Sequence, residues 1–332
     1  MKCILMTQTG TPDVLQPAEV ETPHIVRDTE VLIRIHAAGV NPVDTKLRSR
    51  GTYYPDRMPA ILGCDGAGVI EAVGPAVHRF KPGDEVYYCY GGIGGHPGNY
   101  AEYNVVDESV LAPKPASLDF ASAAAAPLVL ITAWESLYDR AGIKQGDTVL
   151  VHAGAGGVGH VAIQLAKAAG CTVITTVSSA EKASFVKALG ADHILHYRDD
   201  DVIKRVLAIT GGRGADISFD TVGGKIFDQC FKTTKPYGDI VSLLQPGADT
   251  DWKQARLYNQ RVSLELMLSP HFFGWKEALT HHGEILRECA RLFESGALTL
   301  HLSTTLPLAE AAQAHRLIEQ GGMTGKIALV NG

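Results

Sequence analysis

Three glycines in the middle of the chain have a spacing that suits a ligand carrying phosphates. They are Gly154, Gly156 and Gly159, in the stretch VHAGAGGVGH, which follows the apolar run DTVLV and leads into VAIQLAKAAG. Between a strand and a helix, this G-x-G-x-x-G spacing permits a tight turn, then a close approach of the backbone to a pyrophosphate, then close helix–sheet packing. The first N–H groups of the helix then face the phosphates. The residues expected to contact a dinucleotide are Gly154, Gly156, Gly157, Val158 and Gly159.

The residues one strand later indicate which dinucleotide the loop would take. A site for NAD usually has Asp or Glu at the end of the second strand, where the acid bonds the ribose 2′-hydroxyl. Here the stretch reads TTVSSAEK, with Ser178, Ser179 and Lys182 in place of an acid at the tip. Small hydroxyls and a nearby cation suit a 2′-phosphate, so the sequence favours NADPH over NADH. A glycine-rich turn without any ligand is the alternative.

Two more features lie near this position. Ser178-x-x-Glu181 also matches a capping box, which would begin the next helix and is compatible with a bound anion. Tyr197 and Arg198 follow the third strand, where they could supply a lid or a further cation to the cofactor. An ordinary surface position is an equally good interpretation of both.

The elements that would position these residues alternate between strands and helices. From Asp147 to about Pro270, six apolar strand patterns are separated by helical ones, which predicts a doubly wound parallel sheet covered on both faces. The carboxyl ends of such strands line the ligand crevice. Val222 and Leu243 follow the fourth and fifth strands, so we expect both to contact the cofactor.

The rest of the chain predicts a second domain rich in β-structure. The first 125 or so residues read as short strands between turns, and the last 60 contain two amphipathic helices followed by the strand GKIALV. We expect this tail to return to the first domain. The predicted division is therefore residues 1–125 with 266–332 as one domain and residues 126–265 as the other, an α/β architecture.

Composition excludes several other classes of protein. The net charge of −6, without long runs of either sign and without a basic stripe rich in aromatics, argues against binding to nucleic acid or to an anionic membrane. No stretch reaches the roughly 18–20 apolar residues of a membrane span. No signal peptide is evident at the start, so a cytoplasmic protein is the default expectation. The six cysteines are scattered without a C-x-x-C pair, which predicts free thiols.

Several motifs in their usual order resemble the medium-chain dehydrogenase/reductase superfamily. They are AAGVNPVDTKLRSRG, PAILGCDGAGVIEAVGPAVHRFKPGDEVY, NYAEY, ASAAAAPLVLITAWESL, VHAGAGGVG, FDTVGG and GKIALV. They cover nearly the whole length. The resemblance implies a GroES-like β domain, an inserted Rossmann domain with a six-stranded parallel sheet, and an active site in the cleft between the two.

The positions of zinc ligands in this superfamily carry other residues here. Zinc-dependent alcohol dehydrogenases have a cysteine where this chain has Asn41, and His-Glu where it has Cys64-Asp65. An asparagine amide is a poor zinc ligand. The chain therefore resembles the zinc-free quinone oxidoreductases, relatives of zeta-crystallin, and no metal is predicted. A site built on Cys64, Asp65 and one distant ligand is the alternative.

That resemblance implies reduction of quinones or α,β-unsaturated carbonyls by NADPH. Without zinc there is no Lewis acid, and the protein contributes position and a hydrogen-bond donor for the developing oxyanion. An enoyl-thioester reductase of the acryloyl-CoA type and a cofactor-binding protein with little turnover are the alternatives. A homodimer joined through the edge strand around SLELMLSP is also implied.

The candidate catalytic residues come from this resemblance. Asn41 would donate its amide to a carbonyl or a cofactor hydroxyl, unless it only begins a turn before Pro42, with Asp44 as a helix cap. Tyr53 and Tyr54 lie in a loop that borders the substrate in the family, and plain loop packing is equally compatible with either one. Thr132 matches a threonine beside the nicotinamide, with a place in a core helix as the alternative.

Two more residues are assigned to the cofactor side. Phe272 lies in SPHFFGW, where the family has a loop near the nicotinamide and substrate, and it would form an apolar wall there. Lys326, in GKIALV, is placed to reach the cleft, unless it is an ordinary lysine on an edge strand.

Overall fold

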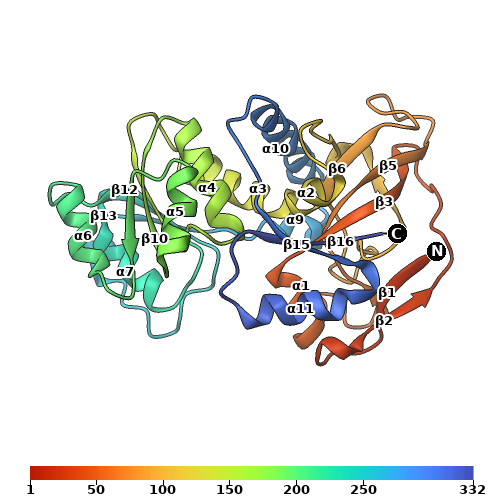
Figure 1. Cartoon of the computed structure of the whole chain (residues 1–332), viewed down its shortest axis with the longest axis horizontal. Helices are drawn as coiled ribbons and strands as arrows, with labels where there is room; N and C mark the ends of the chain where they lie inside the picture. The colour runs from red at the N-terminus through yellow and green to blue at the C-terminus, as the bar shows by residue number, and fades with distance from the viewer. Residues whose placement is uncertain (332) are drawn as a thin grey trace. The chain divides into compact units, whose positions relative to one another are not determined.

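The computed structural model describes residues 1–331, which form two compact units (Figure 1). Unit 1 contains residues Met1–Ile131, Leu268–Gly296 and Leu300–Gly332. Unit 2 contains residues Thr132–Met267 and Ala297–Thr299. Unit 2 is therefore almost continuous in sequence, whereas unit 1 is assembled from the two ends of the chain.

Unit 2 is built on a six-stranded parallel sheet. Its strand order is β11-β10-β9-β12-β13-β14. The chain starts at β9 in the middle of the sheet, adds β10 and β11 on one side, and then crosses over to place β12, parallel to β9, on the other side. The predicted doubly wound sheet is confirmed. The strands are β9 (Thr148–Val151), β10 (Thr172–Val177), β11 (His193–His196), β12 (Ala215–Asp220), β13 (Thr234–Ser242) and β14 (Arg261–Leu264).

Helices connect these strands and cover the sheet with their apolar sides. Leu150, Ile174 and Leu195 come from three neighbouring strands and pack with Val202 and Val206 of α6 in one buried cluster. Burial on both faces explains why the strands read as continuous apolar runs rather than alternating ones. The helices are α4 (Gly157–Ala168), α5 (Ala180–Ala188), α6 (Val202–Ile209), α7 (Lys225–Thr233) and the short α8 (Lys253–Leu257), after the π-helical segment η3 (Glu135–Arg140).

Unit 1 contains a seven-stranded sheet that is mostly antiparallel. Its order is β15-β16-β3-β5-β6-β8, with β7 also paired to β3. Three further strands, β1 (Lys2–Met6), β2 (Leu15–Glu19) and β4 (Ala60–Ile61), form a small second sheet. The members of the larger sheet are β3 (Glu30–Val40), β5 (Asp65–Val73), β6 (Glu85–Cys89), β7 (Tyr103–Asp107), β8 (Ala112–Pro113), β15 (Leu302–Pro307) and β16 (Lys326–Val330).

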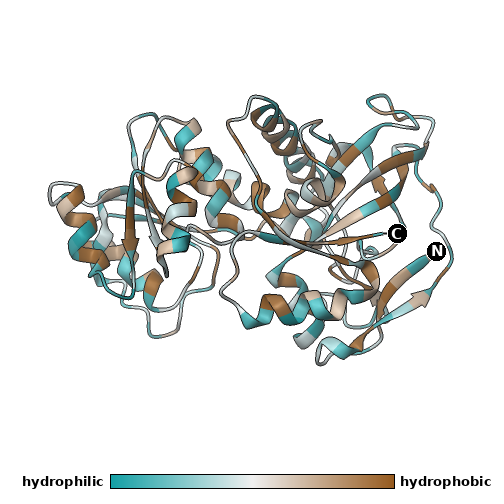
Figure 2. Cartoon of the chain, in the orientation of Figure 1, coloured by the Kyte–Doolittle hydropathy of each residue, from teal (hydrophilic) through white to brown (hydrophobic). Residues whose placement is uncertain are grey.

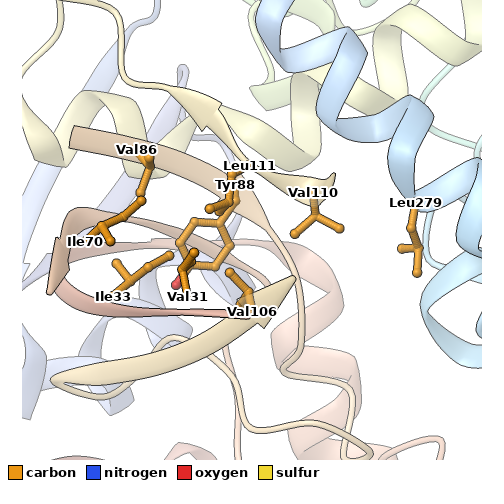
Figure 3. Close-up of a cluster of buried hydrophobic side chains, with 9 residues drawn as sticks. All are labelled: Val31, Ile33, Ile70, Val86, Tyr88, Val106, Val110, Leu111 and Leu279. Carbon is orange, nitrogen blue, oxygen red and sulfur yellow. The ribbon is translucent and has the colours of Figure 1, made fainter. Parts of the chain in front are cut away.

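Buried apolar side chains from this sheet form a hydrophobic core cluster in unit 1 (Figure 3). The ring of Tyr88 lies among aliphatic side chains from four strands, and Leu279 reaches the cluster from helix α10 (Lys276–Glu294). Side chains at alternate positions of a strand share one face, so Val31 and Ile33 of β3 point into the core together. The cluster comprises Val31, Ile33, Ile70, Val86, Tyr88, Val106, Val110, Leu111 and Leu279.

The alanine-rich stretch forms two short helices rather than one long one. Helix α2 (Phe120–Ala125) ends two residues before Pro127, which begins α3 (Pro127–Trp134). Helix α2 lies so close to the sheet that a Cβ on Gly39 would be 2.4 Å from the carbonyl oxygen of Ala124, so residue 39 of β3 must be a glycine. Within residues 1–331, no helix combines the length and the apolar character needed to cross a membrane.

The last strand of the chain belongs to unit 1. Strand β16 pairs antiparallel with β3, with Ile327 opposite Val40. Helices α10 and α11 (Ala311–Gln320) carry hydrophobic and hydrophilic residues along their length, as their sequence pattern indicated (Figure 2). One prediction was too long: the strand expected over SLELMLSP stops at Leu264, and Pro270 lies in the first turn of the short helix α9 (Ser269–Phe273).

Candidate functional site

Steric contacts explain two of the three loop glycines. A Cβ on Gly154 would lie 2.0 Å from Thr175 Oγ1 on β10, and a Cβ on Gly159 would lie 2.4 Å from the carbonyl oxygen of Ala153. The tight turn itself is made by Ala153, whose φ is +52°, and not by Gly154. The reason predicted for Gly154 was therefore wrong: this glycine is required for contact with the neighbouring strand. Gly159 permits close packing, as expected.

Gly156 leaves space beside the start of helix α4. Only the Ala153 carbonyl oxygen comes near a Cβ built there, at 3.2 Å, and the backbone of Gly156 is extended. Gly156 is the N-cap residue of α4, and no side chain caps the helix. The N–H groups of Gly157 and Val158 begin the helix and carry its positive dipole end. These features fit the pyrophosphate of a dinucleotide.

The neighbouring strand β10 ends in two serines. Ser178 and Ser179 are half-buried and follow Val177, the last residue of the strand. Ser179 is the N-cap of α5, and its Oγ accepts a hydrogen bond from the Lys182 N–H at 3.3 Å. The capping role considered for Ser178 therefore belongs to Ser179. Ser178 lies between the last residue of β10 and this N-cap residue, and neither of the two serine positions carries a carboxylate.

Tyr197 lies beside this tip because β11 is the next strand of the sheet. The Tyr197 N–H donates to the Val177 carbonyl at 3.2 Å, and Val177 is opposite His196 in the parallel register. The Tyr197 ring is exposed, and the Arg198 guanidinium lies 6.0 Å from its centroid. The hydroxyls of Ser178 and Ser179, an aromatic ring and a guanidinium are thus gathered at one edge of unit 2.

Asp220 organises the next stretch of this edge, and sequence analysis missed it. Its buried carboxylate accepts hydrogen bonds from the N–H groups of Val222 and Gly223, both at 2.9 Å, and from Ser242 Oγ at 2.7 Å. The Leu243 N–H donates to the Asp220 carbonyl at 3.1 Å. Val222 and Leu243 are therefore both bonded to Asp220, Val222 is exposed, and their contact with a cofactor stays a prediction. The motif FDTVGG contained the only available signal.

In unit 1, Asn41 begins helix α1 (Pro42–Arg50). It forms a capping box with Asp44, whose Oδ2 accepts the Asn41 N–H at 2.8 Å, and Pro42 occupies the first helical position. The helix-capping role considered for Asp44 is confirmed. Neither side chain has any exposed surface. Burial is therefore the main influence on the pKa of the Asp44 carboxyl, which it raises to about 7.

The amide of Asn41 is bonded on both sides. Its Nδ2 donates to Asp65 Oδ2 at 2.8 Å, and its Oδ1 accepts from the ammonium of Lys326. Lys326 is only 3% exposed and also donates to the Val40 carbonyl at 3.1 Å. The structure therefore places the ammonium of Lys326 in the interior of unit 1, and the cofactor contact expected for this residue stays a prediction. It is also not on an edge strand, since β16 lies between β15 and β3.

A second chain of buried polar groups starts at Asp44. Tyr100 Oη lies 3.2 Å from Asp44 Oδ2 and 3.2 Å from His315 Nε2 of helix α11. None of these three side chains is exposed, and burial lowers the pKa of His315 to about 3, which keeps the imidazole neutral. The motif NYAEY contains Tyr100, but nothing in the sequence indicates its contact with His315, because the two residues are 215 positions apart.

Tyr53, Tyr54 and Phe272 form an aromatic group in unit 1. The Phe272 ring centroid is 5.3 Å from that of Tyr53 and 5.6 Å from that of Tyr54. The Tyr54 hydroxyl donates to the Phe272 carbonyl at 2.9 Å, so this donor is already used, whereas the Tyr53 ring is 39% exposed. Thr132 belongs to unit 2, where it is buried in helix α3.

The donors around Asn41 do not fit a zinc ion. Among residues 1–331, no three His, Cys, Asp or Glu side chains are arranged to hold a metal. The oxygen of Asn41 accepts from an ammonium, which would repel a divalent cation. Burial and the carboxylate of Asp44 raise the pKa of the Cys64 thiol well above its usual value, so it remains a neutral and weak ligand.

Comparisons with known proteins agree with this fold. The family model described as "Alcohol dehydrogenase GroES-like domain" matches residues 27–116, and the one described as "Zinc-binding dehydrogenase" matches residues 189–329. The second description covers a whole family. It does not change the donor set in this chain, where the amide oxygen of Asn41 accepts a hydrogen bond from Lys326.

Individual relatives match over almost the whole chain. A protein of Pseudomonas aeruginosa named quinone oxidoreductase is 34% identical over 321 residues, 97% of each chain. A solved structure described as an NAD-dependent alcohol dehydrogenase is 33% identical, with a TM-score of 0.89 and full coverage of both chains. A mycobacterial protein complexed with NADPH is also 33% identical, with a TM-score of 0.86, and the match covers 99% of this chain and 100% of that one. Because the relative from Pseudomonas and the two domains agree along the whole length, the chain belongs to the medium-chain dehydrogenase/reductase superfamily and to its quinone oxidoreductase group.

Proposed function

We propose that this protein is an NADPH-dependent reductase that transfers hydride to quinones or α,β-unsaturated carbonyls without zinc. The observation that carries the choice of cofactor is the edge of β10, where Ser178 and Ser179 stand in place of an acid. A carboxylate there would repel a 2′-phosphate, whereas hydroxyls donate to it. The mycobacterial relative in complex with NADPH supports the proposal. The relative described as an NAD-dependent alcohol dehydrogenase favours the other cofactor, so NADPH and NADH must be compared directly.

The residues of unit 2 would hold the cofactor by its phosphates. Gly156 leaves room for the pyrophosphate next to the uncapped start of α4. At the neighbouring edge, Ser178, Lys182 and the exposed ring of Tyr197 would surround the adenosine ribose and its phosphate. When bound, the nicotinamide supplies the hydride.

The residues of unit 1 would contact the acceptor. The exposed ring of Tyr53 and the neighbouring Phe272 offer a flat apolar wall for a quinone or an enone. The amide of Asn41 is a weaker candidate as donor to substrate than its sequence position implied, because its Nδ2 already donates to Asp65. Thr132 keeps its proposed place beside the nicotinamide on the resemblance alone.

Zinc independence is supported by the donor set. An amide oxygen that is bonded to an ammonium and a thiol with a raised pKa are poor ligands for the metal. Activity of the purified protein should therefore survive prolonged treatment with a chelator. NADPH and NADH oxidation with a naphthoquinone, a medium-chain 2-alkenal and an enoyl thioester would rank the acceptors. Activity lost on chelation and restored by zinc would contradict this proposal.

The variant Ser178→Asp tests the choice of cofactor. A carboxylate at the tip of β10 would repel the 2′-phosphate and accept the 2′-hydroxyl, so kcat/KM for NADPH should fall relative to NADH by roughly tenfold or more. Ser184→Asp is the matched control, since Ser184 is exposed on the helix that follows, α5, and its hydroxyl donates to the Ala180 carbonyl of that helix. An unchanged ratio for Ser178→Asp would mean that the cofactor is recognised elsewhere.

A homodimer in the cytoplasm is part of the same proposal. Strand β14 is the edge of the six-stranded sheet, and Leu264 and Leu266 at its end are 54% and 52% exposed. An apolar edge strand calls for a cover, which a second copy of β14 would supply. Light scattering should give twice the mass of the chain, and Leu264→Lys should give a monomer. A monomeric wild-type protein would refute this part.

A further inference from the structure

The glycine-rich loop 91–98, with the sequence GGIGGHPG, packs against the segment that carries the two tyrosines of the aromatic group. The Tyr53 N–H donates to the Ile93 carbonyl at 3.1 Å, and the side chain of Ile93 is buried. A Cβ on Gly94 would lie 2.4 Å from Thr52 Oγ1. The loop and the tyrosine segment are therefore in direct contact, and each limits where the other can lie.

Four of the five glycines in this loop are required by the backbone. Gly91, Gly92 and Gly94 have φ angles of +81°, +77° and +98°, which side chains with a Cβ rarely adopt. A Cβ on Gly98 would lie 2.2 Å from the Leu62 carbonyl oxygen. A side chain at any of these positions would distort the path of the chain, so these glycines are needed for the fold of the loop.

Gly95 is the exception, because its glycine is required by a side chain. Its φ lies outside the left-handed region. The three atoms nearest to a Cβ built there all belong to the Tyr54 ring, with Cε2 at 2.6 Å, Cζ at 2.9 Å and Cδ2 at 3.1 Å. The backbone would accept an alanine at this position, but the ring would have to move by about 1 Å to restore an ordinary contact.

The Tyr54 ring connects this loop to helix α9. Its hydroxyl donates to the Phe272 carbonyl at 2.9 Å, and the two ring centroids are 5.6 Å apart. The Arg57 guanidinium lies 5.2 Å from the centroid of the Tyr54 ring, and its Nη1 donates to the Gly95 carbonyl at 3.3 Å. The ring is thus held between the loop, Arg57 and α9, and moving it would break or strain the bond to Phe272.

We propose that Gly95 is a specificity-determining residue of the acceptor site. Without a side chain at this position, the Tyr54 ring lies against the loop and holds Phe272 in place. The inference rests on the proposed function, because it takes Tyr53 and Phe272 as the wall that contacts the acceptor. A flat quinone with fused rings would cover this wall and depend on its alignment, whereas a short enal would cover little of it. Glycine at position 95 therefore favours fused-ring quinones over short enals.

The variant Gly95→Ala tests this preference. Its kcat/KM for a naphthoquinone should fall roughly tenfold, mainly through KM, because a displacement of about 1 Å in a positioning group has effects of this order. Its kcat/KM for but-2-enal should fall much less, and its KM for NADPH should not change. Gly247→Ala is the matched control: its Cβ would lie 2.6 Å from Asp249 Oδ1, also the end of a flexible side chain, at an exposed position of unit 2.

Two variants of Tyr54 show whether the effect passes through its ring. In the Tyr54→Ala background the new Cβ at position 95 meets no ring, so Gly95→Ala should have no further effect on kcat/KM. Tyr54→Phe keeps the ring and removes only the donor to the Phe272 carbonyl. Amide hydrogen exchange in residues 268–275 should be faster in Gly95→Ala and in Tyr54→Phe, but not in Gly247→Ala. Tyr54→Phe also remains informative if Gly95→Ala folds poorly.

The outcomes separate this inference from the proposed function. A loss confined to the naphthoquinone that disappears in the Tyr54→Ala background, together with faster exchange in α9, supports the role of Gly95. Equal losses for both acceptors, or a loss that persists in the Tyr54→Ala background, would overturn it. Unchanged exchange in both Gly95→Ala and Tyr54→Phe would overturn it as well, whether or not the protein reduces either acceptor. A wild-type protein that reduces neither acceptor would refute the proposed function on its own.

Discussion

The two units bury carboxylates in different ways. In unit 1, Asp65 and Asp44 lie beside an ammonium that comes from a distant strand. In unit 2, Asp220 is equally buried, yet its partners are two backbone N–H groups and a serine hydroxyl within its own sheet. In unit 1 the stabilisation of the carboxylates depends on the single side chain of Lys326, whereas in unit 2 it comes largely from backbone N–H groups of the loop after β12. A charge held by the backbone leaves side chains such as Val222 free at the surface, which suits an edge that must accept a ligand.

The largest effect in unit 2 should come from its backbone. In Gly159→Val, the new Cβ would lie 2.4 Å from the Ala153 carbonyl, and backbone atoms cannot give way. We expect loss of soluble folded protein, measured by yield and circular dichroism. Gly156→Ala is the matched change, because only one atom lies near its Cβ, at 3.2 Å. It should fold normally and bind NADPH at least roughly tenfold more weakly, which corresponds to about 1.4 kcal/mol. Normal NADPH affinity in Gly156→Ala would place the pyrophosphate elsewhere.

Asp220→Ala should have the next largest effect. It leaves the N–H groups of Val222 and Gly223 and a buried hydroxyl without an acceptor, at a cost of about 3 kcal/mol in the free energy of unfolding. Asp220→Asn keeps one oxygen for the N–H groups and should cost about 1 kcal/mol. Urea unfolding measures both. Equal losses would show that the negative charge matters, and unit 2 would then resemble unit 1.

Glu265 gives a pH-dependent contrast with the pair of Asp65 and Lys326. Burial raises the pKa of Glu265 to about 8, with the neighbouring Glu135 adding to the shift and Arg140 opposing it. A raised pKa means that the folded protein holds a proton which the unfolded chain releases near pH 4.5. This contribution to stability is complete below that pH and is lost as the pH rises to about 8.

The variant Glu265→Gln removes this titration. Relative to the wild type, its free energy of unfolding should rise between pH 5 and pH 8 by at most about 1.4 kcal/mol per pH unit. Thermal unfolding of both proteins across that range gives the difference, and Glu288→Gln, at an exposed position on α10, is the control. Parallel curves for Glu265→Gln and the wild type would mean that Glu265 is ionised throughout.

Ser179→Ala should have the smallest effect of the series. It removes the side chain that caps α5 and should cost about 1 kcal/mol. Because Ser179 also lies at the proposed phosphate edge, NADPH affinity should fall as well, by roughly three- to tenfold. Ser179→Asp keeps the cap and adds a charge, so it should retain stability while losing affinity for NADPH. Loss of stability alone in Ser179→Ala would restrict this residue to capping.

Patterns that repeat locally could be read from the sequence, and contacts across the chain could not. Six apolar strands between helices predicted the sheet of unit 2 because each strand is buried by its immediate neighbours. The end of β14 was misjudged because Leu266, Met267 and Leu268 remain apolar after the pairing with β13 has stopped at Leu264. Capping was assigned to Ser178 because Glu181 stands three residues after it, as in a capping box, whereas the backbone shows that Ser179 begins the helix.

The cluster around Lys326 illustrates what the sequence could not give. Asn41 was singled out for its position, yet its partners Asp65 and Lys326 come from two other strands, and the lysine is 285 residues away. A lysine in a terminal strand is usually exposed, and nothing local distinguishes this one. Tyr100 and His315 escaped notice for the same reason, because 215 residues separate them.

The pairing of β16 with β3 also determines when each unit can be completed during synthesis. Residues 132–267 of unit 2 leave the ribosome in one continuous stretch, and its sheet can assemble while later residues are still being added. Asp44 and Asp65 are made early, but the strand carrying their cation is made after the whole of unit 2. Until Lys326 emerges, the nascent first unit must either keep its two acids in contact with water or hold them protonated. Its final closure is therefore a late event, and the period before it is the time when a newly made chain most needs protection from aggregation.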